Sequence, residues 1–357
     1  MKLKLIVLSA ILFSSLTNSQ TLDETLSNLS QTAGTAYVKP VISAFGSNLN
    51  SGWVSQLPEP ILLGFHIDLK IIGMGSFFSK DDKNFSVSGT FRFTSDQIDL
   101  ILQNSGYSPQ SIGQSNYNQL KSDFAKQKFD VQFSGPTIIG SKNDFLKIKF
   151  PGKDFQSGNT TYKLNSYEVA VEDVKGFLDE IPAFPTAAAQ LTLGTIAGTN
   201  ISFRYFPNID IKDMGKFSFW GAGALHNPGV WFNNPLPLDV AIGYFYQQLK
   251  VGDIFESHAS EFGLFIGKTI GGLFAIKPYA GATFESSKTT VKYEYQEIQY
   301  INDTPINVNV PIKFELDGNN NIGLLVGVLF KLAAININVD YKAANTNTVS
   351  AGVSLGW

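Results

Sequence analysis

Three histidines, His66, His226 and His258, are the first residues to test for metal or acid–base chemistry. They lie far apart in the sequence, and none belongs to an HExxH pattern, which places two histidine ligands on one helix face. The chain contains no cysteine, so disulfides, thiolate metal sites and cysteine nucleophiles are excluded. We therefore expect no metal centre.

Two glycine-containing motifs resemble ligand loops only in part. The DGNNN run from Asp317 suggests a calcium loop, but Ile322 and Val328 stand where an EF-hand needs Gly and Glu. The GMG run at Gly73 lacks the third glycine of a dinucleotide-binding fingerprint, because Phe78 occupies that position. We expect neither an enzyme nor a cofactor.

Large aromatic side chains offer a different chemistry, the binding of an apolar ligand. Trp53 and Trp231 lie in segments that do not alternate like strands, and for both a ligand contact and a structural role remain open. Trp220 and Trp357 fit a membrane interface better, where tryptophan is enriched. The predicted ligand-binding residues are Tyr37, Phe45, Trp53, Trp231 and Phe232.

The last eleven residues, 347–357, indicate how such residues are positioned. They alternate without a break, with apolar side chains on one face and Ser or Gly on the other, as the lipid-facing strand of an outer-membrane barrel requires. The terminal residues also resemble the signal that the outer-membrane assembly machinery reads, and this signal comprises Val353, Leu355 and Trp357.

Composition favours the same fold class. Charged residues make up 16% of the chain, against roughly 25% in ordinary soluble domains. A soluble β-sandwich or propeller would also alternate, but its outward face should be charged, whereas the non-apolar face here is mostly Gly, Ser, Asn and Thr. The longest apolar run of the mature chain, 322–330, is too short for a transmembrane helix. We predict an all-β, transmembrane antiparallel barrel.

The N-terminal region predicts two segments ahead of this barrel. Residues 1–19 form a signal peptide, with Lys2 and Lys4 before a short apolar stretch and cleavage expected between Ser19 and Gln20. Residues 20–60 form a helical hatch in or beneath the lumen, because apolar residues recur there at steps of three and four. Removing the two lysines leaves 25 basic against 30 acidic residues, a net charge of −5, which gives no basic surface for nucleic acid.

The barrel is expected to occupy residues 61–357 and to contain about fourteen strands. Residues 288–316 carry many charges, so we expect an external hairpin there; if they cross the membrane, the count is sixteen. Residues 95–127 show helical spacing, and by strand parity this insertion should be periplasmic. Upstream of residue 180 the predicted strands lie near 61–79, 84–94, 128–138, 143–150 and 162–174.

Short motifs along the mature chain resemble an uncharacterised family of outer-membrane proteins from Bacteroidota, a domain of unknown function. These motifs are AYVKP from Ala36, GFHID from Gly64, GMGSFF from Gly73, SGPTIIGS from Ser134, RYFP from Arg204, HN at His226 and KPY from Lys277. The predicted strand count and helical hatch also resemble FadL-type barrels, which transport fatty acids and hydrocarbons. The first resemblance implies no activity, and the second implies an apolar cargo.

Two functions follow as hypotheses. The first is a monomeric bacterial outer-membrane barrel that lets a small hydrophobic molecule cross passively through a hatch-gated lumen. The second is a structural or assembly barrel that anchors protein partners through residues 95–127 or 288–316. In both, the partners include outer-membrane lipid and the outer-membrane assembly machinery.

Overall fold

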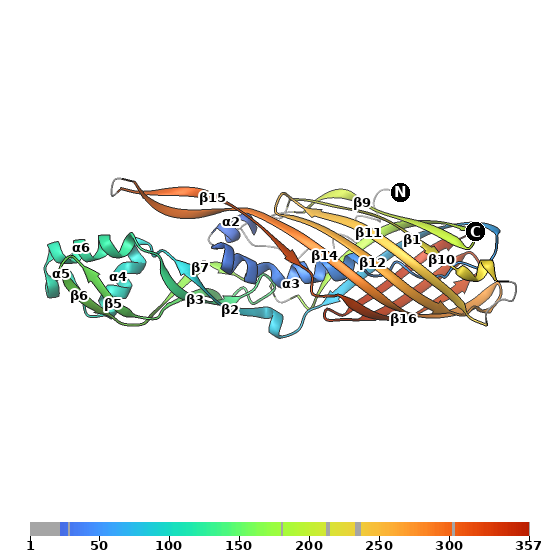
Figure 1. The fold of residues 1–357 in the computed structure, drawn as a ribbon, viewed down its shortest axis with the longest axis horizontal. Helices are drawn as coiled ribbons and strands as arrows, with labels where there is room; N and C mark the ends of the chain where they lie inside the picture. The colour runs from blue at the N-terminus through green and yellow to red at the C-terminus, as the bar shows by residue number, and fades with distance from the viewer. Residues whose placement is uncertain are drawn as a thin grey trace.

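The protein is elongated, with a β-barrel at one end and a smaller folded unit at the other (Figure 1). The computed structural model describes residues 22–27, 29–179, 181–211, 215–232, 237–301 and 304–356. The predicted signal peptide, its cleavage site and Trp357 lie outside these residues.

In the described part of the chain, ten antiparallel strands form a closed barrel. The strands follow the order β12-β11-β10-β9-β8-β1-β18-β17-β16-β14, and pairing between β12 and β14 closes the ring. The short β13 (Ile270–Gly271) pairs with the start of β14. The barrel strands are β1 (Leu63–Phe77), β8 (Ala183–Ile196), β9 (Thr199–Ile211), β10 (Gly215–His226), β11 (Asp239–Val251), β12 (Phe255–Gly267), β14 (Phe274–Ile301), β16 (Ile322–Leu332), β17 (Ile335–Ala343) and β18 (Thr348–Gly356).

In the barrel strands, apolar side chains face outward and polar side chains face inward, which is the reverse of the arrangement in a soluble barrel. In β18, Val353 and Leu355 are about half exposed on the outer surface, whereas Ser350 and Ser354 are buried inside. The neighbouring β16 and β17 likewise carry most of their Ile, Leu and Val side chains outward, with Leu325 and Leu329 of β16 as buried, inward-facing exceptions. An apolar outer belt around a polar interior is the pattern of a barrel that spans a membrane. The predicted fold class is therefore confirmed.

The strand count of fourteen is wrong, because several alternating segments upstream of residue 180 lie outside the barrel. The segments predicted near 84–94, 128–138, 143–150 and 162–174 form smaller sheets of their own. Alternation alone cannot separate the two kinds of strand. The chemistry of the exposed face does separate domain strands from barrel strands. In the domain strands this face carries charged residues, Lys147, Lys149 and Glu168, that a lipid-facing surface would not carry. The count of fourteen also supported the FadL resemblance, which loses that support.

The residues between β1 and β8, 78–182, form the smaller unit, which we call the distal domain (Figure 1). Buried phenylalanines pack edge to face in its core, with Phe93 against Phe150 at a centroid distance of 6.0 Å. Thr94 caps the first helix with a capping box. The elements are η1 (Asp81–Lys83), β2 (Asn84–Phe91), α4 (Ser95–Asn104), α5 (Pro109–Ile112), α6 (Gln114–Ala125), β3 (Phe129–Pro136), β4 (Phe145–Phe150), β5 (Lys153–Ser157), β6 (Thr160–Leu164) and β7 (Tyr167–Lys175).

A long hairpin lies at the same end of the barrel as the distal domain. Beyond its barrel portion, β14 pairs with β15 (Thr304–Asp317) over residues 288–301. The hairpin lies outside the ring, as predicted. Arg92 of the distal domain donates a hydrogen bond from Nη1 to the Ile298 carbonyl oxygen at 2.8 Å. Lys128 forms an ion pair with Glu297 at 2.7 Å. We call this end the domain end, and the end with Gly356 the turn end.

The prediction that residues 95–127 are periplasmic while 288–316 are external is therefore wrong, since both lie at the domain end (Figure 1). The parity argument counted β2 as a barrel strand. β2 pairs with β3 inside the distal domain instead, so the chain does not cross the barrel there. Strand parity gives the correct side only when every counted strand crosses the membrane.

Candidate functional site: the plugged lumen

A helical segment and the residues that follow it close the barrel. Helices α2 (Leu22–Ser27) and α3 (Gln31–Leu49) precede the barrel in sequence, and α3 lies at the domain end with most of its residues buried (Figure 1). Its C-terminal end reaches the rim of the barrel, where Asn48 contacts β1 and β8, and residues 50–57 continue into the lumen. We call residues 22–57 the plug. None of the described helices is both long enough and apolar enough to cross a bilayer.

Small and polar residues of α3 seat it against the barrel wall. A Cβ atom at Gly46 would collide with the Ser287 side chain, so glycine permits the closest approach of helix and strand. Asn48 donates a hydrogen bond from Nδ2 to the Phe184 carbonyl at 2.8 Å and accepts one from the Ser76 hydroxyl at 2.8 Å. Hydrogen bonds and small residues thus fix the position of α3.

Three buried cations hold the C-terminal end of α3. Lys342 of β17 donates a hydrogen bond to the Asn50 carbonyl at 2.7 Å, and Arg204 of β9 donates one to the Ser51 carbonyl at 2.8 Å. Lys70 of β1 donates one to the Gly52 carbonyl at 3.1 Å. Asn50 is the C-cap of α3, and Ser51 and Gly52 follow it, so these carbonyls lie at the negative end of the helix dipole, where cations are stabilising. We call this arrangement the carbonyl clamp.

Acidic side chains on the lumen wall balance these cations. Lys342 forms ion pairs with Glu285 at 2.7 Å and with Glu261 at 3.5 Å, and all three side chains are almost fully buried. Asp340, also buried, accepts a hydrogen bond from the Tyr279 hydroxyl at 3.1 Å. The ion pairs of this network join β12, β14 and β17, so these charges balance within the barrel wall.

Trp53 extends the clamp towards the turn end. The Arg204 guanidinium lies 3.9 Å from the Trp53 ring centroid, and Phe245 stacks on Trp53 at a centroid distance of 4.8 Å. Arg204 also donates a hydrogen bond from Nε to Gln190 at 2.8 Å. A cation stacked on a desolvated indole is strongly held. Trp53 therefore packs the plug against β9 and β11 a few residues after the end of α3.

The structure does not bring the five predicted ligand-binding residues together. Tyr37 and Phe45 are buried in packing: the Tyr37 hydroxyl donates a hydrogen bond to the Lys175 carbonyl at 2.9 Å, and Phe45 lies edge to face against Phe184 at 4.9 Å. Trp53 lies in the lumen. Trp231, the last residue of η2 (Pro228–Trp231), and Phe232, which follows it, are 65% and 55% exposed at the turn end. In the described residues, no three histidine or acidic side chains form a metal-binding group.

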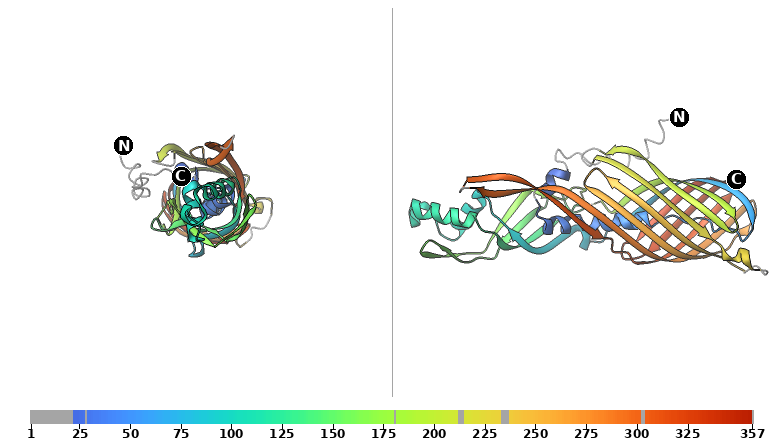
Figure 2. Two further views of the ribbon diagram at one scale, coloured as in Figure 1. Left: turned by 90° about the vertical axis from the view of Figure 1, so that its left-hand side faces the viewer. Right: turned by 45° about the horizontal axis from the view of Figure 1, so that its top comes forward.

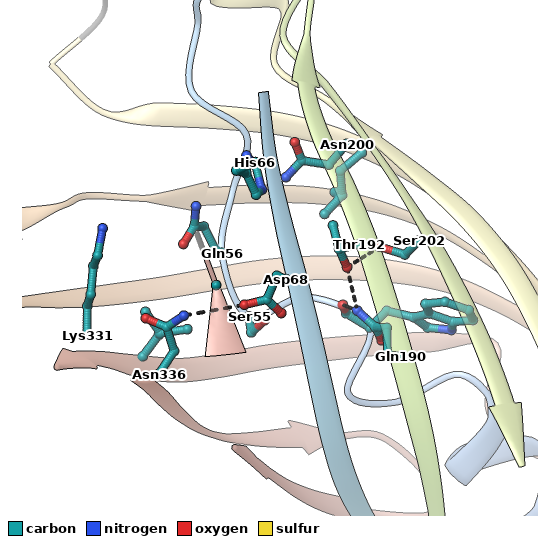
Figure 3. Close-up of a pocket in the computed structure, with 14 residues that line it drawn as sticks. Ser55, Gln56, His66, Asp68, Gln190, Thr192, Asn200, Ser202, Lys331 and Asn336 are labelled. Carbon is teal, nitrogen blue, oxygen red and sulfur yellow. Dashed lines mark hydrogen bonds between the residues drawn. The ribbon is translucent and has the colours of Figure 1, made fainter. Parts of the chain in front are cut away.

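A cavity of about 90 Å³ opens beside the plug at the turn end (Figure 3). Inward-facing polar side chains of β1, β8, β9 and β17 line it together with Ser55 and Gln56 of the plug. Asp68 lies on one wall, where its Oδ2 accepts hydrogen bonds from Ser354 at 2.8 Å and Asn336 at 3.3 Å. Of the residues that line it, Trp53 belongs to the predicted ligand-binding set, and Ser55, Gln56, Asp68 and the polar residues of β8 and β9 do not. Their signal is polar residues at alternate positions, as in Gln190 and Thr192 or Asn200 and Ser202.

The N-terminal half of the plug packs against the distal domain. Ile138 of the distal domain donates a backbone hydrogen bond to the Tyr37 carbonyl at 3.0 Å. The domain also accepts the Tyr37 hydroxyl bond at Lys175. Viewed from the domain end, the distal domain lies over the barrel opening (Figure 2, left). One end of the plug is thus packed into the distal domain and the other lines the turn-end cavity.

Comparisons with known proteins give a family match and solved structures of remote similarity. The model of a family described as "Family of unknown function (DUF6588)" matches residues 1–357. No curated protein matches the chain. Solved structures similar to it include the β domain of the Bordetella autotransporter BrkA, with 9% identity, a TM-score of 0.29, and coverage of 82% of this chain and 99% of that chain. The transport unit of the Escherichia coli autotransporter AIDA-I has 9% identity, a TM-score of 0.26, and coverage of 88% and 98%. A loop-deletion mutant of Vibrio cholerae OmpT has 10% identity, a TM-score of 0.23, and coverage of 82% and 98%.

Proposed function

Since this chain belongs to the family of unknown function DUF6588, whose description gives no activity, we propose a function from the geometry: a closed outer-membrane barrel that anchors the distal domain and the hairpin at the cell surface, where they bind protein partners. The observation that carries this proposal is the seated plug. Its helix is fixed by the carbonyl clamp at one end and packed into the distal domain at the other.

The apolar belt supports a place in a bilayer. It covers the outer surface of the strands from the turn end to about the level of Phe262 and Phe284. Farther along β12 and β14, the outward residues become polar, as at His258 and Lys288. Lipid contacts only the apolar part, so these strands extend beyond the bilayer on one side, towards the domain end.

The lengths of the connections support the orientation. Outer-membrane barrels have short periplasmic turns and longer extracellular loops. At the turn end, β8 joins β9 through residues 197–198 and β16 joins β17 through residues 333–334. At the domain end lie the distal domain and the β14–β15 hairpin. The proposal therefore places the domain end outside the cell and the turn end in the periplasm.

Conductance in planar lipid bilayers tests the closed state. We expect the full chain to give no steady ion current, because the plug closes the lumen, and a variant lacking residues 22–57 to conduct through the emptied polar interior. A steady current through the full chain would contradict the proposal. The plug-deleted variant must first show the heat-modifiable migration of a folded barrel, so that an unfolded protein is not mistaken for a closed one.

Cysteine labelling on intact cells tests the orientation. The chain has no native cysteine, so only the introduced thiol can react. Ser115→Cys places a thiol on the exposed surface of α6, and Thr269→Cys places one in the turn between β12 and β14. A membrane-impermeant maleimide should label Ser115→Cys in intact cells and label Thr269→Cys only after lysis. The reverse pattern would invert the orientation and contradict surface display.

Passage of a small hydrophobic molecule remains the second candidate. The apolar side of the turn-end cavity, formed by Leu225, Leu329 and Trp53, favours it. Transport would require the plug to move, and the carbonyl clamp opposes that movement. Uptake of a fluorescent fatty acid by cells with and without the protein separates the two candidates: equal uptake supports the anchor, and protein-dependent uptake supports transport.

A further inference from the structure

The turn-end cavity contains polar atoms that no group of the protein satisfies, and we propose that it binds one uncharged, polyhydroxylated ring, the chemistry and size of a single sugar unit. The side-chain amides of Gln56 and Asn200 belong to the lining and keep hydrogen-bonding atoms that no described residue satisfies. A polar atom that faces a cavity is satisfied there by water or by a ligand.

The free hydrogen-bonding capacity of these two side chains follows from their contacts. The Gln56 side-chain amide projects into the cavity and makes no hydrogen bond to any described residue (Figure 3). Asn200 uses its Oδ1 to accept a bond from Thr195 at 3.1 Å, which leaves its amide nitrogen available. Free donors and acceptors thus enter the cavity from the plug and from β9.

This mixture of donors and acceptors selects the ligand class. A hydroxyl group both donates and accepts, so a polyhydroxylated ring can satisfy amide oxygens and amide nitrogens on all sides. An apolar ligand would leave these atoms unpaired. The ionisable side chains in the lining are Asp68, Lys331 and His66. Because Asp68 and Lys331 carry opposite charges, the site has no strong preference for an anion or a cation.

The size of the cavity fits one ring. One water requires roughly 10–15 Å³ of cavity volume, so the volume of about 90 Å³ holds several waters that a single ring can replace. Arg204 and Phe245 cover the two faces of Trp53, so no sugar stacks on this indole. Binding therefore depends on hydrogen bonds, and we expect a dissociation constant in the millimolar range, about 4 kcal/mol by conversion.

The plug forms one wall of the site, through Trp53, Ser55 and Gln56. A bound ring would contact the plug and the barrel at once and would stabilise the seated plug by mass action. This inference does not depend on which end of the barrel faces outward, so its failure would leave the proposed anchor function standing.

Saturation-transfer difference NMR tests the site on the full chain in nanodiscs, because glycosidic detergents would compete for it. The probe is N-acetylglucosamine, with diglycine as a zwitterion of similar hydrogen-bonding capacity. The test variant is Gln56→Ala, which removes no hydrogen bond within the described residues and should not disturb folding. The matched control is Gln103→Ala, an exposed glutamine on α4.

We expect saturation transfer to N-acetylglucosamine with the parent chain and with Gln103→Ala, and at least a five-fold weaker signal with Gln56→Ala. Diglycine should give little transfer. No transfer to the sugar, equal transfer with all three proteins, or stronger transfer to diglycine would each overturn the proposal.

Discussion

At the scale of single residues, the carbonyl clamp is the feature with the largest expected energetic effect. Lys342 is about 1% exposed and contacts Glu285, Glu261 and the Asn50 carbonyl. A buried charge of this kind is stable only while its partners are present, because desolvation opposes it. Removing the lysine leaves two buried carboxylates and the Asn50 carbonyl without their cation.

Lys342→Met should therefore lower the free energy of unfolding by about 3–5 kcal/mol, as does the loss of one partner from other buried ion pairs. Denaturant unfolding of the refolded protein in micelles measures the change. Lys313→Met is the matched control, because Lys313 is exposed on β15 and forms no ion pair in the described residues. Equal midpoints for the two variants would show that the clamp contributes nothing to stability.

A residue-scale pH effect is expected in the distal domain. The Tyr117 hydroxyl donates a hydrogen bond to Asp99 at 2.7 Å, and burial together with this carboxylate raises the pKa of Tyr117 to about 12, from 10. Because the folded pKa lies above the unfolded one, this contribution to stability is complete below pH 10 and is lost as the pH rises towards 12. Tyrosinate absorbance, compared between the parent chain and Tyr117→Phe, should show one tyrosine titrating late. Titration of that tyrosine near pH 10 would refute the effect.

At the scale of elements, helix α3 is matched to the barrel wall by small residues. Glycine to alanine inside a helix normally stabilises it by about 0.5–1 kcal/mol, because glycine has more conformational freedom to lose. At Gly46 the added methyl would collide with both side-chain atoms of Ser287, so neither a small rotation nor a rotamer change relieves it. Close contact with the barrel wall, and not helix propensity, therefore favours glycine at position 46.

Gly46→Ala should consequently destabilise the protein by about 1–3 kcal/mol, the usual cost of overpacking. Gly46→Ala with Ser287→Gly should restore most of the loss, since the second change removes the colliding atoms. Thermal unfolding of both variants in the same detergent gives the comparison. Stabilisation by Gly46→Ala alone would mean that α3 does not lie this close to β14.

At the scale of the whole molecule, the barrel and the distal domain have separate hydrogen-bonded sheets. β1 and β8 pair directly from Leu63 with Ile196 to Phe77 with Ala183, so the barrel wall is closed without any residue of the distal domain. The domain contacts the barrel through the plug and the hairpin, at Tyr37 and at Glu297 and Ile298. Surface ion pairs such as Lys128 with Glu297 contribute little stability.

Replacing residues 79–181 by a short glycine-containing turn should therefore leave a folded barrel with heat-modifiable migration. The plug should become more susceptible to protease near Tyr37, where its cover is lost, while its clamped end stays protected. Limited proteolysis with mass mapping measures both. Failure of the shortened chain to assemble would show that the distal domain takes part in barrel folding.

The sequence by itself determined the fold class, the hairpin outside the barrel and the helical spacing before residue 50. Each of these follows from local periodicity or charge, which neighbouring residues alone specify. The strand count, the side on which residues 95–127 lie and the contacts that hold the plug were decided only by the tertiary structure. Alternation is the same in a barrel strand and in a domain strand, so β2 to β7 could not be separated from the barrel by period alone. The clamp joins Lys70, Arg204 and Lys342 from three strands to three successive carbonyls. Such a contact has no sequence signal, because it depends on barrel closure and on the depth to which the plug enters the lumen.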